Sequence, residues 1–284
     1  MSDKYCIISN LFGHYEYSSE IKRICEIEDV DVIILNGNIQ NPYSRRNDLR
    51  RSLGSFLSFS KDIYVLPGKY EINNGFDDTV NEFKRFDNYY NGNEKRSVKL
   101  NNSQMIFLNS PEKIYNKKYN SIKDDLDQKR LEDIVNKELE SPENTILISS
   151  YPKKFKSKNA FDYQELGKVK CDLIFEGEYL EKGMILDKNI SQILKKLNYP
   201  ISLKRDNFGS DKLEKIFSKY NIKKGISSYF YNSKNRAISE IKDKKIPESR
   251  FSEEFYYNPG SASRGEFGII EVEKGKVRYK QYQI

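Results

Sequence analysis

Four short apolar runs, each followed at once by a turn rich in Gly, Asn, Ser or Pro, constrain the fold of this chain more than any other feature. The runs are Tyr5–Ile8, Val32–Leu35, Ile63–Leu66 and Thr145–Ile148. In an open α/β sheet, such turns gather at the carboxyl ends of the strands, where binding and catalytic sites are built. The sequence therefore indicates where a site lies before it indicates what the site does.

Helical patterns separate these runs. Ile21, Ile24 and Cys25 recur at i, i+3 and i+4, and a second helix is expected over residues 43–60. Strand, helix, strand, helix and strand in this order are typical of a parallel sheet with right-handed crossovers. Further expected elements are helices over 76–86, 126–139, 190–197 and from 210, a hairpin over 96–109, a loop over 110–125, a strand over 172–175 and a closing hairpin over 268–282.

Length and composition favour one folded domain. The 284 residues fit one large domain, or one domain with a long insertion, and residues 153–207 have the least regular pattern. Hydrophobic residues make up only 37% of the chain but are concentrated in short runs. No run approaches the ~20 apolar residues of a membrane span, and no signal-like segment opens the chain. We therefore expect a soluble, cytoplasmic protein that does not bind membranes.

Two residue types limit the chemistry. The three cysteines, Cys6, Cys25 and Cys171, are far apart and form no C-x-x-C pair, so buried reduced thiols are expected rather than a zinc site. His14 is the single histidine, and histidine is the usual acid or base near neutral pH and a frequent ligand for zinc, iron and copper. We expect His14 to be a surface loop residue.

Five glycine- and asparagine-containing stretches and one turn carry a family resemblance. They are Ser9-Asn10-Leu11-Phe12-Gly13, Asn36-Gly37-Asn38, Pro67-Gly68-Lys69-Tyr70-Glu71, Ser149-Ser150-Tyr151-Pro152, Ser227-Ser228-Tyr229-Phe230-Tyr231 and the turn Asn258-Pro259-Gly260-Ser261. In this order they resemble the motifs of the calcineurin-like metallophosphoesterase superfamily. The resemblance implies an α/β fold, a four-layer α-β-β-α sandwich of two packed mixed sheets flanked by helices. It implies one domain over 1–284 with a family-atypical insertion at about 153–207.

The resemblance also implies where two metal ions would be held, because the family clamps phosphate between two metals about 3.5–4 Å apart. At the positions that match the family's ligands stand Asn10, Phe12, Asn38, Lys69, Ser150, Tyr229 and Tyr231. Tyr70 stands at the position of the family's catalytic histidine, and Glu71 is the only carboxylate left in these loops. Such a set lacks the negative charge that two divalent cations need. We expect no metal, no cofactor and no catalytic residue.

The aromatic residues among these positions suggest a filled pocket, in which Phe12, Tyr70, Tyr151, Tyr229 and Tyr231 converge. Ordinary packing is the plain interpretation of each ring. The sharper alternative is a platform on which a base stacks while Lys69 meets a phosphate. A cluster of Arg45, Arg46, Arg50 and Arg51 on the second helix, with a net charge of +7, fits phosphate contacts as well as a solvated, ion-paired surface.

Three functions follow from these observations. The first is a catalytically inactive member of the family that serves as a structural, regulatory or protein-interaction subunit, with a protein partner or a second copy of itself. The second is a nucleic-acid or nucleotide-binding protein that uses the basic surface and the aromatic-filled pocket. The third is a residual phosphoesterase with relocated ligands.

Overall fold

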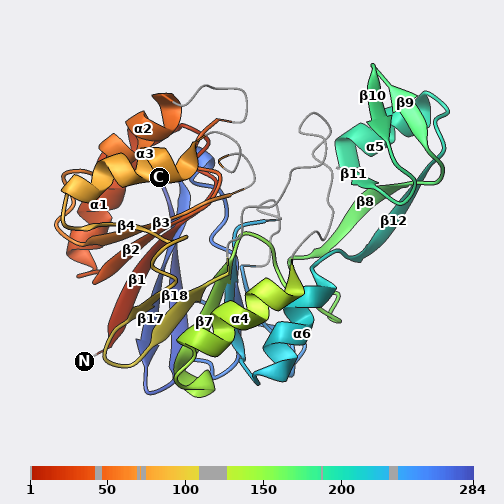
Figure 1. Ribbon diagram of the computed structural model, residues 1–284. Helices are drawn as coiled ribbons and strands as arrows, with labels where there is room; N and C mark the ends of the chain where they lie inside the picture. The colour runs from red at the N-terminus through yellow and green to blue at the C-terminus, as the bar shows by residue number, and fades with distance from the viewer. Residues whose placement is uncertain are drawn as a thin grey trace.

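The computed structural model describes residues 2–41, 47–68, 71, 75–108, 127–186, 188–229 and 236–284. Two large sheets dominate it (Figure 1). The first has six strands in the order β18-β17-β1-β2-β3-β4. Strands β1 to β4 are parallel, and β17 and β18 are antiparallel. Their bounds are β1 (Asp3–Ile8), β2 (Val32–Asn36), β3 (Asp62–Leu66), β4 (Tyr89–Asn91), β17 (Glu266–Glu273) and β18 (Lys276–Gln283).

The second sheet has seven strands in the order β15-β14-β16-β13-β7-β6-β5. Its centre is parallel, from β16 through β13 and β7 to β6, and its outer strands are antiparallel. The bounds are β5 (Ser97–Lys99), β6 (Gln104–Phe107), β7 (Thr145–Ser149), β13 (Lys224–Ser227), β14 (Ala237–Ser239), β15 (Lys244–Lys245) and β16 (Phe255–Tyr257).

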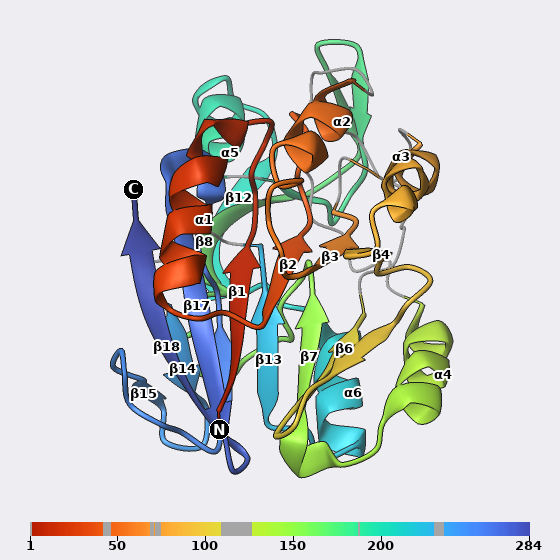
Figure 2. The same ribbon diagram turned by 90° about the vertical axis from the view of Figure 1, so that its left-hand side faces the viewer.

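Alternating side chains stack these sheets into layers, because successive residues of a strand point to opposite faces. In β1, Tyr5 and Ile7 lie in the core between the two sheets, whereas Cys6 and Ile8 pack under helices on the outer face. Those helices are α1 (Ser18–Ile27), α2 (Asn47–Gly54) and α3 (Phe76–Glu82), followed by the 3-10 turn Phe83–Arg85. On the outer face of the second sheet lie α4 (Gln128–Glu138) and α6 (Asp211–Lys219). Figure 2 shows both helical layers on the outside of the sheet pair.

Several expected elements are confirmed, and two expectations are wrong. β7 covers the expected run Thr145–Ile148 and ends at Ser149, and β6 is fully buried as the inner arm of its hairpin. The helix expected over 43–60 ends at Gly54, after which i to i+3 bonds such as Phe56 N to Leu53 O form turns. Cys171 is exposed rather than buried, because it lies in the connection between two strands at the surface. The loop expected over 110–125 lies outside the described residues.

Residues 163–207 form a separate small unit, here called the arm, which projects from the sheet pair (Figure 1). Its strands are β8 (Tyr163–Val169), β9 (Leu173–Phe175), β10 (Glu178–Leu180), β11 (Ile185–Leu186) and β12 (Ile201–Asn207), and its helix is α5 (Lys188–Lys196). β8 and β12 pair antiparallel along seven residues and make the stem. The arm has its own apolar core, which includes Val169, Leu180 and Leu194. The expected strand over 172–175 and helix over 190–197 are therefore both parts of it.

Asp162 fastens the base of the stem. Its fully buried carboxylate accepts hydrogen bonds from Phe155 N at 3.2 Å, Gly209 N at 3.0 Å and Asn207 Nδ2 at 2.8 Å. Phe155 and Gly209 come from the two chain segments that connect the arm to the sheet pair, and Asn207 is the last residue of the arm. Burial raises the pKa of the Asp162 carboxyl to about 6, from an ordinary value of 3.8.

This shift makes stability depend on pH. The folded chain holds the Asp162 proton more tightly than the unfolded chain. This proton therefore contributes fully to the unfolding free energy below pH 3.8, and the contribution is lost as the pH rises through about 6. From about pH 4 to about pH 7, we expect the wild type to lose about 2–3 kcal/mol of unfolding free energy relative to Asp162→Asn. Urea denaturation across this range measures it.

Asp206→Asn is the matched control, because Asp206 is an aspartate of the same stem that is partly exposed and paired with Lys204. That pairing, through the hydrogen bond from Lys204, lowers the pKa of Asp206, so its titration lies below this pH range. If the unfolding free energies of the wild type and Asp162→Asn change in parallel with pH, the raised pKa of Asp162 is contradicted.

Candidate functional site

The turns that follow β1, β2, β7 and β13 meet where the two sheets face each other. Asn10 N donates to Gly37 O at 3.1 Å, which joins the first two turns. Tyr229 N donates to Ser150 O at 2.9 Å, which joins the turns of the second sheet. Asn36 Nδ2 reaches Ser149 O at 3.5 Å and links one sheet to the other. The expectation that these loops gather is confirmed.

The first two turns require unusual backbone conformations. Asn10, Phe12 and Asn38 have φ of 56°, 50° and 52°. Asparagine tolerates this left-handed region, whereas it is rare for a bulky side chain such as Phe. Phe12 is held there because Phe12 N donates to Asn38 O at 2.9 Å and Gly13 N donates to Ile39 O at 2.7 Å. The loops are therefore fixed by their own main chains.

The side-chain amides of Asn10 and Asn38 bond directly to each other at the centre of the site. Asn38 Nδ2 donates to Asn10 Oδ1 at 2.8 Å. Asn10 Nδ2 in turn donates to Ser228 O at 2.7 Å and to Gly260 O at 3.2 Å. Both side chains are buried. Asn10 therefore uses both amide hydrogens and its oxygen to connect the first, second and fifth loops to the Asn258–Ser261 turn.

Glu71 connects the second and third loops. Its carboxylate accepts from Gly68 N at 2.7 Å, Asn38 N at 3.0 Å and Gln40 N at 3.0 Å, and it is fully buried. Burial raises the pKa of Glu71, and these main-chain N–H groups oppose the rise. The two loops approach so closely that a Cβ on Gly68 would lie 2.1 Å from Asn38 N. Glycine is therefore required at residue 68.

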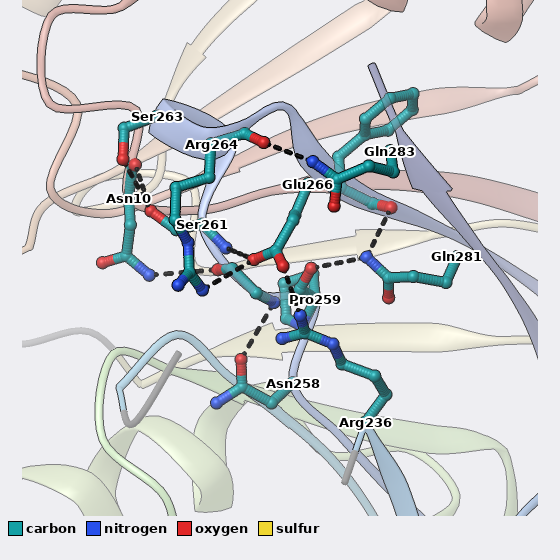
Figure 3. A network of polar contacts seen from close by, with 12 residues as sticks. Asn10, Arg236, Asn258, Pro259, Ser261, Ser263, Arg264, Glu266, Gln281 and Gln283 are labelled. Atoms are coloured by element: carbon teal, nitrogen blue, oxygen red, sulfur yellow. Dashed lines mark hydrogen bonds and ion pairs between the residues drawn. The ribbon is translucent and has the colours of Figure 1, made fainter. Parts of the chain in front are cut away.

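The Asn258–Ser261 turn locks the first loop to the closing hairpin (Figure 3). Ser261 Oγ donates to Asn10 O at 3.1 Å, and Ser263 N donates to the same oxygen at 3.0 Å. Glu266 accepts from Ser261 N at 3.0 Å and pairs with Arg236 at 2.7 Å and with Arg264 at 2.9 Å. Gln281 Nε2 donates to Pro259 O at 2.8 Å. The turn serves here as a clamp made of hydrogen bonds.

Tyr151 and Tyr229 lie together at the edge of this network, with ring centroids 4.9 Å apart. Tyr151 also packs against the core under α4 and α6. Part of the expected aromatic convergence is therefore present. Lys69, Tyr70 and Tyr231 belong to the same sequence-predicted set and lie outside the described residues.

The arginine cluster and the lone histidine lie outside this network. Arg50 makes a two-pronged hydrogen bond to Glu82, with distances of 2.6 and 2.5 Å. Arg51 is exposed on α2, and Arg45 and Arg46 lie outside the described residues. His14 is exposed, and its Nδ1 lies 2.8 Å from a Glu16 oxygen, as expected for a surface residue. Arg50 is thus engaged by a carboxylate of the same chain.

Sequence reasoning did not find the residues that hold the clamp together. Arg236 and Glu266 lie shortly after two of the quoted stretches but belong to none of them, and Gln281 lies in the last strand. Ser228, inside the fifth stretch, contributes only its main-chain oxygen. Glu266 follows the Asn258–Ser261 turn closely in the sequence, which is the one local signal for its role. Nothing in the sequence indicated its partner Arg236.

Those residues of the predicted set that the structure describes do not fit a pair of divalent cations. Asn10 Oδ1 receives an amide hydrogen from Asn38, and the Asn10 amide hydrogens point at two carbonyl oxygens. Glu71 is surrounded by main-chain N–H groups. Within the described part of the chain, no group of three or more His, Cys, Asp or Glu side chains is placed to hold a metal. Metal ligands need exposed lone pairs and negative charge, and this network uses its oxygens internally.

Comparison with known proteins supports the fold. No family model and no curated protein sequence matches the chain. It is similar to the structure of TT1561 of Thermus thermophilus, with 10% identity, a TM-score of 0.58 and 99% coverage of both chains. It is also similar to GAP50, described as the anchor in the inner membrane complex of Plasmodium, with 10% identity, a TM-score of 0.51, and coverage of 99% of this chain and 84% of that chain.

A third similar structure is the purple acid phosphatase PPD1 from yellow lupin, with 7% identity and a TM-score of 0.50; the match covers 99% of this chain and 52% of that chain. At such identities the likeness shows the fold alone. Together with the two mixed sheets and their helical layers, it confirms the predicted four-layer fold of the metallophosphoesterase type. In the described residues, no helix has the length and apolar character to span a bilayer.

Glu71 provides the sharpest test of this network. Glu71→Gln places an NH₂ group against main-chain N–H donors, so we expect the unfolding free energy to fall by about 2–4 kcal/mol. Glu82→Gln is the control, because Glu82 is an exposed glutamate whose ion pair contributes at most about 1 kcal/mol. Equal stability of the two variants in urea denaturation would contradict the role assigned to Glu71.

Proposed function

We propose that this chain is a non-catalytic protein with a metallophosphoesterase fold, which acts as an interaction subunit and binds other proteins. The single observation that supports this proposal is the hydrogen bond between Asn10 and Asn38. It joins two of the seven positions at which the family resemblance places metal ligands. An amide pair of this kind connects the loops without any ion, so the fold keeps its loop arrangement while the loops lose the capacity for metal chemistry.

The loss of metal chemistry has a direct test. Isothermal titration of Mn²⁺, Zn²⁺ and Mg²⁺ into the purified protein should give no binding at the Asn10–Asn38 loops, and the melting temperature should not rise with added metal. Hydrolysis of a chromogenic phosphodiester in Mn²⁺ should stay at the buffer rate. Chelator-sensitive turnover, or a metal-dependent rise in melting temperature, would contradict the proposal.

Asn10→Asp tests the loss of metal binding by returning a carboxylate to one of the ligand positions. The new oxygen would face Ser228 O and Gly260 O in place of two amide hydrogens, so we expect a loss of about 2–4 kcal/mol of unfolding free energy. Added Mn²⁺ should not restore this loss, because Phe12 carries no donor atom. The matched control is Asn189→Asp on the exposed surface of α5. Recovery of full stability in Mn²⁺ would show that the loops still form a metal site.

A nucleotide-binding function is the second candidate, and the Tyr151–Tyr229 ring pair favours it. Aromatic pairs at the edge of a loop cluster provide faces on which a base stacks. If the protein binds nucleic acid through phosphates, its affinity for a fluorescent oligonucleotide should fall steeply between about 50 and 200 mM salt. Affinity that does not change with salt would exclude phosphate-driven binding. The engagement of Arg50 by Glu82 reduces the support for this candidate.

A further inference from the structure

Exposed apolar side chains are concentrated on the arm. Among the described residues, nine large apolar side chains are exposed, and four of them lie within residues 163–207. These four are Ile174, Tyr179, Ile193 and Leu197, with exposures of 68%, 52%, 49% and 56%. Single exposed apolar residues are ordinary, but this concentration in one projecting unit indicates a contact surface.

The four residues form two separate faces. Ile174 and Tyr179 are directly opposite each other in the β9–β10 pair, so they make one apolar patch, here called the hairpin face. Ile193 and Leu197 are four residues apart, and Leu197 N donates to Ile193 O at 3.0 Å. They therefore lie on one side of α5 and of the turn that directly follows it, here called the helix face.

The two faces point away from a shared core. The inner side of the hairpin, with Leu173 and Phe175, packs into the same cluster as Leu194 and Ile190 of α5. Phe175 and Tyr199 meet edge to face at 5.3 Å in this cluster. The outer sides of the hairpin and of α5 consequently cannot meet within one chain. Figure 1 shows the β9–β10 hairpin and α5 as separate parts of the arm.

The charges on the two faces are opposite. Residues 170–182 around the hairpin contain four acidic residues, Asp172, Glu176, Glu178 and Glu181, and two lysines at the ends, Lys170 and Lys182, so the hairpin carries a net negative charge. Residues 188–198 along α5 contain Lys188, Lys195 and Lys196 and no Asp or Glu. Lys188 pairs with Glu165 at 2.8 Å, while Lys195 and Lys196 are exposed next to Ile193 and Leu197. Each face thus matches the other in apolar character and complements it in charge.

We propose that the arm is an interface between copies of this chain, in which the hairpin face of one copy binds the helix face of the next. Because the two faces point away from the shared core in different directions, one partner arm does not cover both, so the contact is heterologous and builds head-to-tail assemblies rather than a symmetric pair. This inference deepens the proposed interaction role and rests on it. Because both apolar patches are small, the contact is weak, with a Kd on the order of 10–100 μM.

Sedimentation of the full chain from about 10 to about 300 μM should show an average mass that rises with concentration. Ile174→Lys damages only the hairpin face, because it adds a charge of the same sign as the α5 lysines. The double variant Ile193→Gln, Leu197→Gln damages only the helix face. Each variant alone should lose association by at least about tenfold. Ile27→Gln is the control, because Ile27 is 66% exposed on α1, outside the arm.

Mixing the two variants is decisive. One contributes an intact helix face and the other an intact hairpin face, so the mixture should form a one-to-one complex even though neither variant associates alone. Unchanged melting temperatures would confirm that both variants are folded. A monomeric wild type, association that survives in either variant, or a mixture that stays monomeric would overturn the proposal. None of these results involves metal or turnover, so the metal titration tests the proposed function separately.

Discussion

The structure depends on how the main-chain groups at the carboxyl ends of its central strands are satisfied. Buried carbonyl and N–H groups need partners, and at this edge they come from side chains of distant segments. Asn10 bonds to Ser228 O and Gly260 O, and Glu71 collects the N–H groups of residues 38, 40 and 68. At an edge where the family resemblance places metal ions, side-chain amides and one carboxylate thus bond to the main chain of the neighbouring loops.

The same network extends to the closing hairpin. Glu266 accepts a hydrogen bond from Ser261 N and pairs with two arginines, and Gln281 donates a hydrogen bond to Pro259 O. Because Ser261 and Ser263 both bond to Asn10 O, the first and last strands of the chain fix one loop together. The arm extends from the opposite sheet and is fastened by Asp162. The two sheets therefore support the arm, on which we propose that a second copy of the chain binds.

Sequence reasoning predicted the sheet-forming parts well because their signal is local. The apolar runs of β1, β2 and β7 specify strands directly, and the family motifs predicted the layers. The end of α2 at Gly54 depended on turn bonding that apolar spacing does not report. The partners of Glu71 are main-chain N–H groups, and Arg236 pairs with Glu266, which is distant in the sequence. No pattern in the sequence encodes such contacts.

The bond between the Asn10 and Asn38 amides is the central claim, and crystallography tests it most directly. Crystals grown in excess Mn²⁺ and measured at the manganese absorption edge would locate any bound ion. We expect no anomalous peak at these loops and an amide contact close to the 2.8 Å of the present structure. Two anomalous peaks between the side chains of Asn10 and Asn38, with the amides turned apart to coordinate them, would contradict it.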